Sequence, residues 1–215
     1  MGKQSICYIL GAAPIESLPS LDLIMTGQNG LICADGGYRY ARALGITPLC
    51  VVGDFDSGLP PAEDIPVIRV KPEKDETDLQ LAVTIGIQKG YRTFVIYGGL
   101  GGRLDHSFAN IQMIAGLKQS DGISIMLMDM HHKLFVLQNE SCCLRQEDYD
   151  YFSLFSLLPE SHGVWVERGK FPLSKATLYS TIPLGVSNAF AQPEVMVRVE
   201  DGMLLVICSR ETAGN

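Results

Sequence analysis

The stretch TFVIYGGLGGRLDH, residues 93–106, runs from an apolar segment through a glycine-rich loop into the start of a helical pattern. Its first five residues, Thr93–Tyr97, are all β-branched or aromatic, the kinds of side chain that pack well in strands. A strand followed by a short glycine turn and a helix is the repeating unit of a parallel α/β sheet. The stretch therefore predicts a strand, a tight loop and a helix in that order.

The same alternation extends outward on both sides of this stretch. Further helices are expected from their apolar spacing at Tyr38–Leu44, Leu79–Lys89 and 106–118, and Thr77 with Gln80 forms a capping pattern ahead of the second. Further strands are expected at Ile6–Leu10, Leu31–Ala34, Leu49–Val52, Pro66–Val70 and Ile123–Met128. Residues 1–130 are therefore predicted to form a mostly parallel, Rossmann-like α/β domain.

The pattern changes near residue 130. Residues 131–215 contain short apolar runs separated by turns and no long helical pattern. Asp201-Gly202, between two of these runs, is a hairpin signal. The predicted second domain is all-β, a sandwich or a barrel, and we take the β-sandwich as the working model. The runs are Leu134–Leu137, Tyr151–Leu157, Gly163–Val166, Ala176–Ser180, Val195–Val199 and Met203–Ile207.

Composition narrows the function classes. The chain has 215 residues, 47% of them hydrophobic, and a formal net charge of −7, which disfavours nucleic acid as a partner. The opening apolar run is too short for a signal peptide, and no stretch approaches the roughly 18 apolar residues of a membrane span. We therefore expect a cytoplasmic protein without a membrane partner. The six cysteines include no C-x-x-C pair, and those in apolar runs are expected to be buried free thiols.

Carboxylates recur where predicted strands end. Asp35, Asp54, Asp56 and Asp105 each follow a strand or its loop, and Asp78 stands at the start of a helix. Ligands of open parallel sheets bind beyond the carboxyl ends of the strands, so these acids should meet at one edge. Two carboxylates two residues apart, as in Asp54-x-Asp56, point the same way and suit Mg²⁺, which prefers oxygen ligands.

Other residues beside these acids fit phosphate. Lys71 and Lys74 precede the helix that Asp75 and Asp78 open, and Arg103 follows a loop of four glycines. Glycines let backbone N–H groups approach phosphate closely. The loop is neither G-x-G-x-x-G nor a P-loop, which disfavours the ordinary Rossmann and P-loop nucleotide sites.

Four motifs together resemble the signature of the thiamine pyrophosphokinase family. They are Ala34-Asp35-Gly36-Gly37, Gly53-Asp54-Phe55-Asp56-Ser57, Asp75-Glu76-Thr77-Asp78 and the stretch from Gly98 to His106. Two weaker matches follow, Gly169-Lys170-Phe171-Pro172-Leu173 and Gly185-Val186-Ser187-Asn188. The resemblance implies transfer of pyrophosphate from ATP to the hydroxyethyl group of thiamine, which gives thiamine diphosphate and AMP. It also implies Mg²⁺ and a homodimer with active sites at the subunit interface.

The resemblance and the residue chemistry assign three groups of site residues. The metal-binding acids would be Asp54, Asp56, Asp78 and Asp105; together with Arg103 they would form the catalytic set. The ATP contacts would be Asp35, Gly36, Lys71, Lys74, Asp75, Thr77, Gly98, Gly101, Arg103 and His106. The thiamine contacts would be Phe171, Ser187 and Asn188, with Trp165 as the rival to Phe171 for stacking.

Several alternatives stay open from sequence. Either Asp78 or Asp105 would accept the proton of the hydroxyl group. The pair Asp54-x-Asp56 also occurs in Mg²⁺-dependent phosphatases and in nucleotide-sugar transferases. A non-catalytic sensor of nucleotide or thiamine is the remaining alternative, and it predicts binding without turnover.

Overall fold

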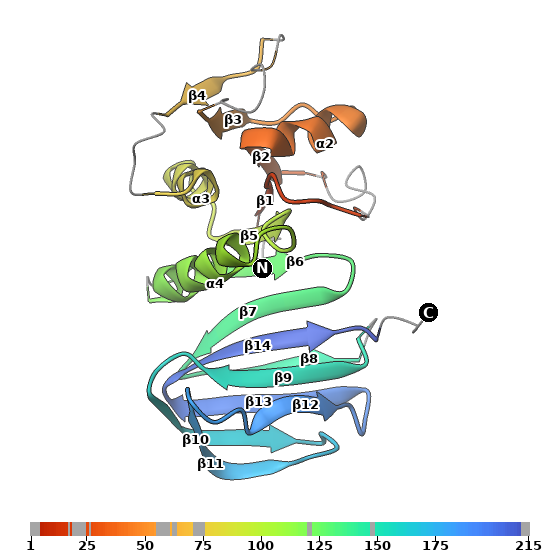
Figure 1. Cartoon of the computed structure of the whole chain (residues 1–215), viewed down its shortest axis with the longest axis vertical. Coiled ribbons are helices and arrows are strands. Elements are labelled where there is room, and N and C mark those ends of the chain that lie inside the picture. Colours follow the sequence, from red (N-terminus) through yellow and green to blue (C-terminus); the bar gives the residue numbers. More distant parts are fainter. Residues whose placement is uncertain are drawn as a thin grey trace. The chain divides into compact units, whose positions relative to one another are not determined.

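The structure is a computed structural model, and it describes residues 5–16, 18, 25, 27–54, 61, 64–70, 76–119, 122–146 and 149–211. The chain divides into two compact units (Figure 1). Unit 1 comprises Met1–Met113 and Gly122–Met130, and unit 2 comprises Ile114–Asp121 and His131–Asn215. In the described residues, no helix has both the length and the apolar character needed to cross a membrane.

Unit 1 is built on parallel strands. Each neighbouring pair runs in the same direction, as the alternating strand and helix patterns predicted. The strands are almost fully apolar, because a parallel sheet is covered on both faces. Their order is β6 (Ser124–Met128), β5 (Thr93–Tyr97), β1 (Ile6–Leu10), β2 (Gly30–Ala34), β3 (Cys50–Gly53) and β4 (Val67–Arg69).

The order of these strands reverses at β1. The chain places β2, β3 and β4 successively on one side of β1, then returns to place β5 and β6 on the other. The carboxyl ends of β1 and β5 therefore lie at a switch point, where connections leave in opposite directions and a crevice forms.

Helices cover both faces of the unit 1 sheet. Ala41 of α2 (Tyr38–Ala43) packs in one buried cluster with Leu10 and Cys33. Gly86 of α3 (Asp78–Gln88) packs on the other face, against Cys7 and Phe94. A single 3₁₀ turn, η1 (Asp35–Gly37), precedes α2, and α4 (Leu104–Lys118) joins β5 to β6.

Unit 2 is built on antiparallel strands in two sets. One set has the order β12 (Gly185–Ala189), β9 (Tyr151–Ser156), β14 (Met203–Ser209) and β7 (His132–Gln138). The other has the order β11 (Leu173–Tyr179), β10 (Glu160–Glu167), β13 (Glu194–Asp201) and β8 (Ser141–Arg145). One hydrophobic cluster draws on both sets, with Phe152 and Val206 from the first and Val164 and Val197 from the second.

The hairpin expected at Asp201-Gly202 is wrong. Strand β13 pairs with β10 and β8, whereas β14 pairs with β7 and β9. The chain crosses from one set to the other at this turn, because Val197 and Val206 then face the same core. The Asn139 side chain completes the turn by accepting a hydrogen bond from the Gly202 N–H at 2.8 Å.

Candidate functional site

A pocket of about 480 Å³ lies in unit 1 at the carboxyl ends of the strands. That volume is in the range of small-molecule sites. The pocket draws residues from the segments that follow β1, β2, β3 and β5 and from the first turns of α3 and α4. Its lining residues are Gly11, Ala12, Ala13, Ala34, Asp35, Asp54, Glu76, Thr77, Asp78, Leu79, Gly98, Gly99, Gly101, Asp105, His106, Ala109 and Asn110.

The pocket is centred on the switch point of the sheet. Gly11 directly follows β1, Gly98 directly follows β5, and the two backbones are in close contact. Gly98 has a φ of +70°, and a Cβ atom added there would lie 2.5 Å from the Gly11 carbonyl oxygen. The Ala13 N–H donates a hydrogen bond to the Gly98 carbonyl at 3.1 Å. Only glycine fits this crossing, and the lining here is mainly backbone and small side chains.

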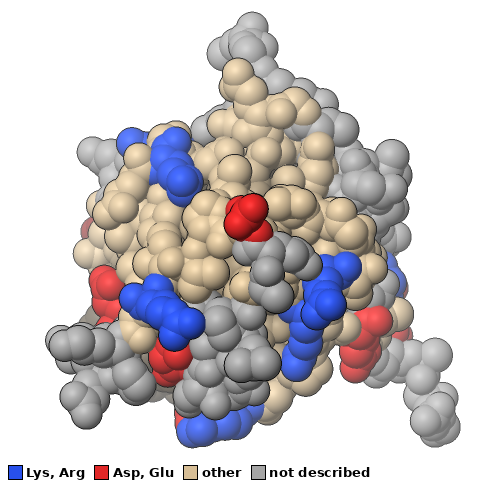
Figure 2. Space-filling model, turned by 90° about the horizontal axis from the view of Figure 1, so that it is seen from above, with Lys and Arg blue, Asp and Glu red and all other residues tan. Residues whose placement is uncertain are grey.

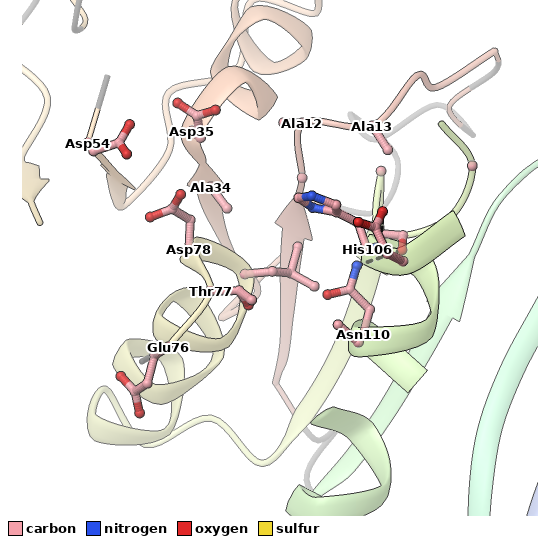
Figure 3. A pocket seen from close by; sticks show the side chains of 17 residues that line it. Ala12, Ala13, Ala34, Asp35, Asp54, Glu76, Thr77, Asp78, His106 and Asn110 are labelled. Carbon is pink, nitrogen blue, oxygen red and sulfur yellow. Dashed lines mark hydrogen bonds between the residues drawn. The ribbon is translucent and has the colours of Figure 1, made fainter. Parts of the chain in front are cut away.

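Three carboxylates gather at one end of the pocket. Asp35, Asp54 and Asp78 come from η1, the residue after β3 and the start of α3, and Figure 3 shows their carboxyl groups together. Glu76 points away from this group, and His106 and Asn110 lie at the other end (Figure 3). Asp35 has a φ of +46°, an uncommon conformation for a residue with a side chain. Such backbone strain is often found at functional sites.

The first turn of α3 forms one wall. The Thr77 hydroxyl accepts a hydrogen bond from the Gln80 N–H at 3.1 Å, which confirms the predicted helix cap. Asp78 is the first residue of the helix, so its carboxylate lies where the helix dipole favours negative charge. The cap explains Thr77 structurally, and Asp78 lines the end of the pocket that Asp35 and Asp54 also line.

Arg103 and Asp105 form an ion pair at the start of α4. The guanidinium donates two hydrogen bonds, from Nε to Oδ1 at 3.1 Å and from Nη2 to Oδ2 at 2.5 Å. This hydrogen bonding from Arg103 lowers the pKa of Asp105, and the His106 N–H, which also donates to Oδ1, acts in the same direction. Asp105 is therefore a weak proton acceptor, and both of its oxygens are already engaged.

The charged side chains that line the pocket are mainly acidic. Five of its lining residues are acidic, and among the residues that the structure describes the lining includes no Lys or Arg. Within the same described ranges, no three His, Cys, Asp or Glu side chains are placed to hold a metal ion together. Asp56, Lys71, Lys74 and Asp75, which sequence reasoning assigned to this site, lie outside the described residues. Gly36 is part of η1 and is not among the lining residues.

Sequence reasoning missed Asn110 as a pocket residue. It is one of the buried polar side chains of the chain, and its amide donates a hydrogen bond to the Gly99 carbonyl at 2.7 Å. This bond ties the glycine loop to α4. The signal was one polar residue on the inner face of a helix, which periodicity alone does not distinguish from a surface position.

Hydrogen bonds beside the pocket, which the sequence also did not indicate, hold the segment that follows β1. The Tyr40 hydroxyl accepts a hydrogen bond from the Ile15 N–H at 3.0 Å and donates one to the Ala13 carbonyl at 3.2 Å. Arg39 donates to the Ala12 carbonyl at 2.9 Å. Helix α2 thus holds the segment that follows β1 against the pocket.

The candidate thiamine contacts lie in unit 2. Phe171 is 57% exposed, and its backbone N–H and carbonyl both bond to the side chain of buried Asn188. Ser187 is exposed and has a φ of +58°. Trp165 alternates on β10 with Val164 and Val166, which face the core, so its ring lies on the opposite face and donates to Glu200 at 3.2 Å. The structure brings Phe171 and Asn188 together and leaves Trp165 on the other face of its strand.

Charged side chains are dispersed on the face shown in Figure 2. The Lys and Arg side chains of the described residues on that face stand apart, and acidic side chains lie among them. That distribution does not form the continuous basic patch with which proteins track a phosphate backbone.

An acidic pocket at the switch point of a parallel sheet defines a ligand-binding α/β protein. Comparison with known proteins narrows this class. Residues 21–127 match the family model described as thiamin pyrophosphokinase, catalytic domain. The thiamine pyrophosphokinase of Bacillus subtilis (strain 168) is 26% identical over 211 residues, which are 94% of this chain and 98% of that protein. The chain belongs to the thiamine pyrophosphokinase family, as the four motifs predicted.

Solved structures agree over nearly the whole chain. The crystal structure of thiamine pyrophosphokinase from Bacillus subtilis has a TM-score of 0.88 at 24% identity and covers 97% of this chain and 100% of its own. The corresponding structure from Geobacillus thermodenitrificans has a TM-score of 0.85 at 26% identity, with coverage of 97% and 99%. Both units therefore have counterparts in these proteins.

Proposed function

We propose that this chain is a thiamine pyrophosphokinase, an ATP-dependent enzyme that transfers diphosphate to thiamine and releases AMP. The observation that carries the proposal is the gathering of Asp35, Asp54 and Asp78 at one end of the switch-point pocket. Negative charges at one end of a pocket favour the binding of a cation there, because it offsets their mutual repulsion. In a member of this family, these three carboxylates would help to hold a metal-bound polyphosphate at this end of the pocket.

The donor set fits Mg²⁺. Carboxylate oxygens are the protein ligands that Mg²⁺ takes, usually one or two of them beside phosphate oxygens and water. Asp54 and Asp78 are the described candidates, and Asp56 would join them. Asp105 would join only by giving up its bonds to Arg103. A bound Mg²⁺ would offset the negative charge of the phosphate oxygens.

The nucleotide would lie along the glycine loop. The backbone around Gly98 and Gly101 borders the pocket with no side chain between it and a ligand, so its N–H groups can approach phosphate. Arg103, oriented by Asp105, would supply a fork of donors to the phosphate chain. Thr77, His106 and Asp35 complete the described lining on the nucleotide side, and Lys71, Lys74, Asp75 and Gly36 stay predictions.

The proposed transfer is a single displacement. The hydroxyethyl oxygen of thiamine forms a bond to the β-phosphorus of ATP. The bond from that phosphorus to the oxygen that bridges it to the α-phosphorus breaks, so AMP leaves with that oxygen. The chain binds and orients both substrates, which is the main source of catalysis in phosphoryl transfer. We propose Asp78 as the acceptor of the hydroxyl proton, since the hydrogen bonds from Arg103 lower the pKa of Asp105.

The two substrates would bind to different parts of the chain. We propose that residues 1–130 form a Rossmann-like domain that binds ATP and Mg²⁺, and that residues 131–215 form a β-sandwich that binds thiamine. Phe171 offers an exposed ring for the thiazolium cation, an arrangement that cation–π attraction favours. Trp165 is the weaker candidate, since its ring lies on the outer face of β10.

We further propose a cytoplasmic homodimer in which unit 1 of one subunit faces unit 2 of the other. The described residues of both units carry large exposed apolar side chains. In unit 1 these include Leu104 (83% exposed) and Phe108 (59%), and in unit 2 they include Phe171 (57%), Ile182 (56%) and Leu184 (59%). Clustered exposed apolar side chains commonly mark an interaction surface.

Product analysis tests the function. The purified protein is incubated with thiamine, ATP and Mg²⁺, and the products are separated by chromatography. Thiamine diphosphate and AMP in equal amounts are expected. Thiamine monophosphate with ADP would indicate an ordinary kinase, and free phosphate without a thiamine ester would indicate a phosphatase. Binding of both substrates with no product would indicate a sensor.

A further inference from the structure

The segment that carries Phe171 is fastened to the end of β12. Gly169 and Phe190 form an isolated antiparallel bridge. The Lys170 N–H donates to the Ala189 carbonyl at 2.8 Å, and the Ala191 N–H donates to the Arg168 carbonyl at 3.3 Å. This backbone pairing stops one residue short of Phe171.

The Asn188 side chain continues the pairing where the backbone stops. Its Oδ1 accepts from the Phe171 N–H at 2.9 Å, and its Nδ2 donates to the Phe171 carbonyl at 2.6 Å. Two residues opposite each other in an antiparallel ladder exchange the same two bonds. The Asn188 amide thus takes the place of a peptide group opposite Phe171.

The amide is buried and nearly saturated. Asn188 is 6% exposed, and its Oδ1 also accepts from the Ala189 N–H at 2.9 Å. An amide oxygen has two lone pairs and an amide nitrogen has two hydrogens, so only one N–H remains. A direct role in substrate binding would have to use that single donor.

Gly169 makes the close approach possible. A Cβ atom at this position would lie 3.2 Å from Oδ1 and 3.3 Å from Nδ2 of Asn188, and 2.9 Å from the Val166 side chain. A larger residue would push the segment away from the amide. The packing therefore depends on both Gly169 and Asn188.

The result is an exposed aromatic ring on a fixed backbone. Phe171 is 57% exposed, and the Lys170 ammonium lies 5.6 Å from its ring centroid, within the range of a cation–π contact. A ring whose backbone is already ordered loses less conformational entropy when a ligand stacks on it.

We infer that Asn188 is a positioning residue, which fixes the Phe171 segment for a flat cationic substrate and does not itself contact that substrate. The inference rests on the proposed function, since it assigns thiamine to Phe171. It changes the role that the sequence resemblance gave to Asn188, from thiamine contact to support.

The matched variants are Asn188→Asp and Asn139→Asp. The Asn139 side chain accepts a hydrogen bond from the Gly202 N–H through its Oδ1, and an aspartate at this position keeps that acceptor. Asn188 must both accept and donate, and an aspartate opposes the Phe171 carbonyl. We expect Asn188→Asp to raise the KM for thiamine about tenfold, the change that corresponds to loss of one such bond, and to leave the KM for ATP unchanged. Asn139→Asp should change neither constant by more than about twofold.

A double-mutant cycle separates support from contact. With Phe171→Ala as the background, Asn188→Asp should change the thiamine KM by less than about twofold, because its effect passes through the ring. A further tenfold rise in that background would mean that Asn188 contacts thiamine independently, and the inference would be wrong.

Hydrogen exchange tests whether the Asn188 side chain holds the Phe171 backbone, without any assay of turnover. Asn188→Asp should speed amide exchange at Phe171 about tenfold, and Asn139→Asp should not. Unchanged exchange at Phe171 in folded Asn188→Asp would mean that Asn188 does not hold the Phe171 backbone, and the inference would be wrong. If Asn188→Asp does not fold, Gly169→Ala serves in its place, with the same expected and contradicting results. If the wild-type protein fails to convert thiamine while the exchange result is as expected, the proposed function is wrong, but the support of Phe171 by Asn188 is confirmed.

Discussion

The side-chain amide of Asn110 donates a hydrogen bond to the backbone carbonyl of Gly99 at 2.7 Å, and this bond joins helix α4 to the glycine loop. Asn110 is 9% exposed, so the bond is nearly shielded from water. A glycine loop has little conformational preference of its own, and its shape in the pocket depends on such contacts.

Replacing Asn110 by alanine should therefore cost both stability and nucleotide binding. The Gly99 carbonyl would lose its partner, and we expect the free energy of unfolding to fall by about 1–3 kcal/mol. The KM for ATP should rise while the KM for thiamine stays unchanged. Urea unfolding and steady-state kinetics measure these effects. Ser107→Ala is the control, since its longer bond of 3.4 Å to Gly101 is exposed.

Asp54→Asn and Asp78→Asn should each abolish turnover and leave the protein folded. Both side chains direct their carboxylates at the same end of the pocket, where a neutral amide holds a cation poorly. For Asp78 the loss includes the proposed proton acceptor, a contribution of about a hundredfold to ten-thousandfold. Turnover and circular dichroism are measured together. Asp64→Asn, an exposed acid outside the pocket, should retain activity. Near-normal turnover in either pocket variant would remove the metal assignment.

Phe171→Ala should raise the KM for thiamine by about tenfold and leave kcat largely unchanged. The ring offers a face to the thiazolium cation, and its loss removes binding that substrate and transition state share. Phe171→Trp should restore the wild-type constant, since an indole is at least as good a face for a cation. If the alanine variant keeps the wild-type KM, the stacking role belongs elsewhere, and Trp165→Ala is then the variant to measure.

Thiol reactivity should follow burial. Burial raises the pKa of Cys7 and of Cys142 to about 12 each, and it also raises the pKa of Cys33. The thiolate is the reactive form, so these cysteines should resist alkylation at pH values near neutrality. Cys143 is exposed and should react first. Mass spectrometry of the native protein after brief alkylation checks this order, and early labelling of Cys7 or Cys33 would contradict it.

The strands of unit 1 were predictable because parallel strands are buried on both faces. Such strands form continuous apolar runs, and two of them, Ile6–Leu10 and Thr93–Tyr97, have the bounds expected from sequence. In unit 2 two strands were missed, β8 (Ser141–Arg145) and β12 (Gly185–Ala189). Each has a single buried side chain, Leu144 or Asn188, so neither carries an alternating apolar signal.

The site was predictable where it follows a topological rule and unpredictable where it depends on packing. Strand-end acids meet at one edge of a parallel sheet, so Asp35 and Asp54 were expected near one another. The bond from Asn110 to Gly99 and the bonds from Asn188 to Phe171 depend on how elements pack in three dimensions. No spacing of residues in the sequence predicts these hydrogen bonds. The pairing of Arg103 with Asp105 was likewise invisible in the motif.

We expect the acidic pocket to accept a polyphosphate only together with a divalent cation. Isothermal titration calorimetry of ATP into the wild-type protein, with Mg²⁺ or with a chelator, tests it directly. We expect affinity to be at least about tenfold higher with Mg²⁺, since uncompensated like charges repel by about 1 kcal/mol or more per close pair. The same titration with the double variant Asp54→Asn, Asp78→Asn should show that advantage reduced. Equal affinity with and without Mg²⁺ in the wild-type protein would mean that the pocket binds ATP without the cation.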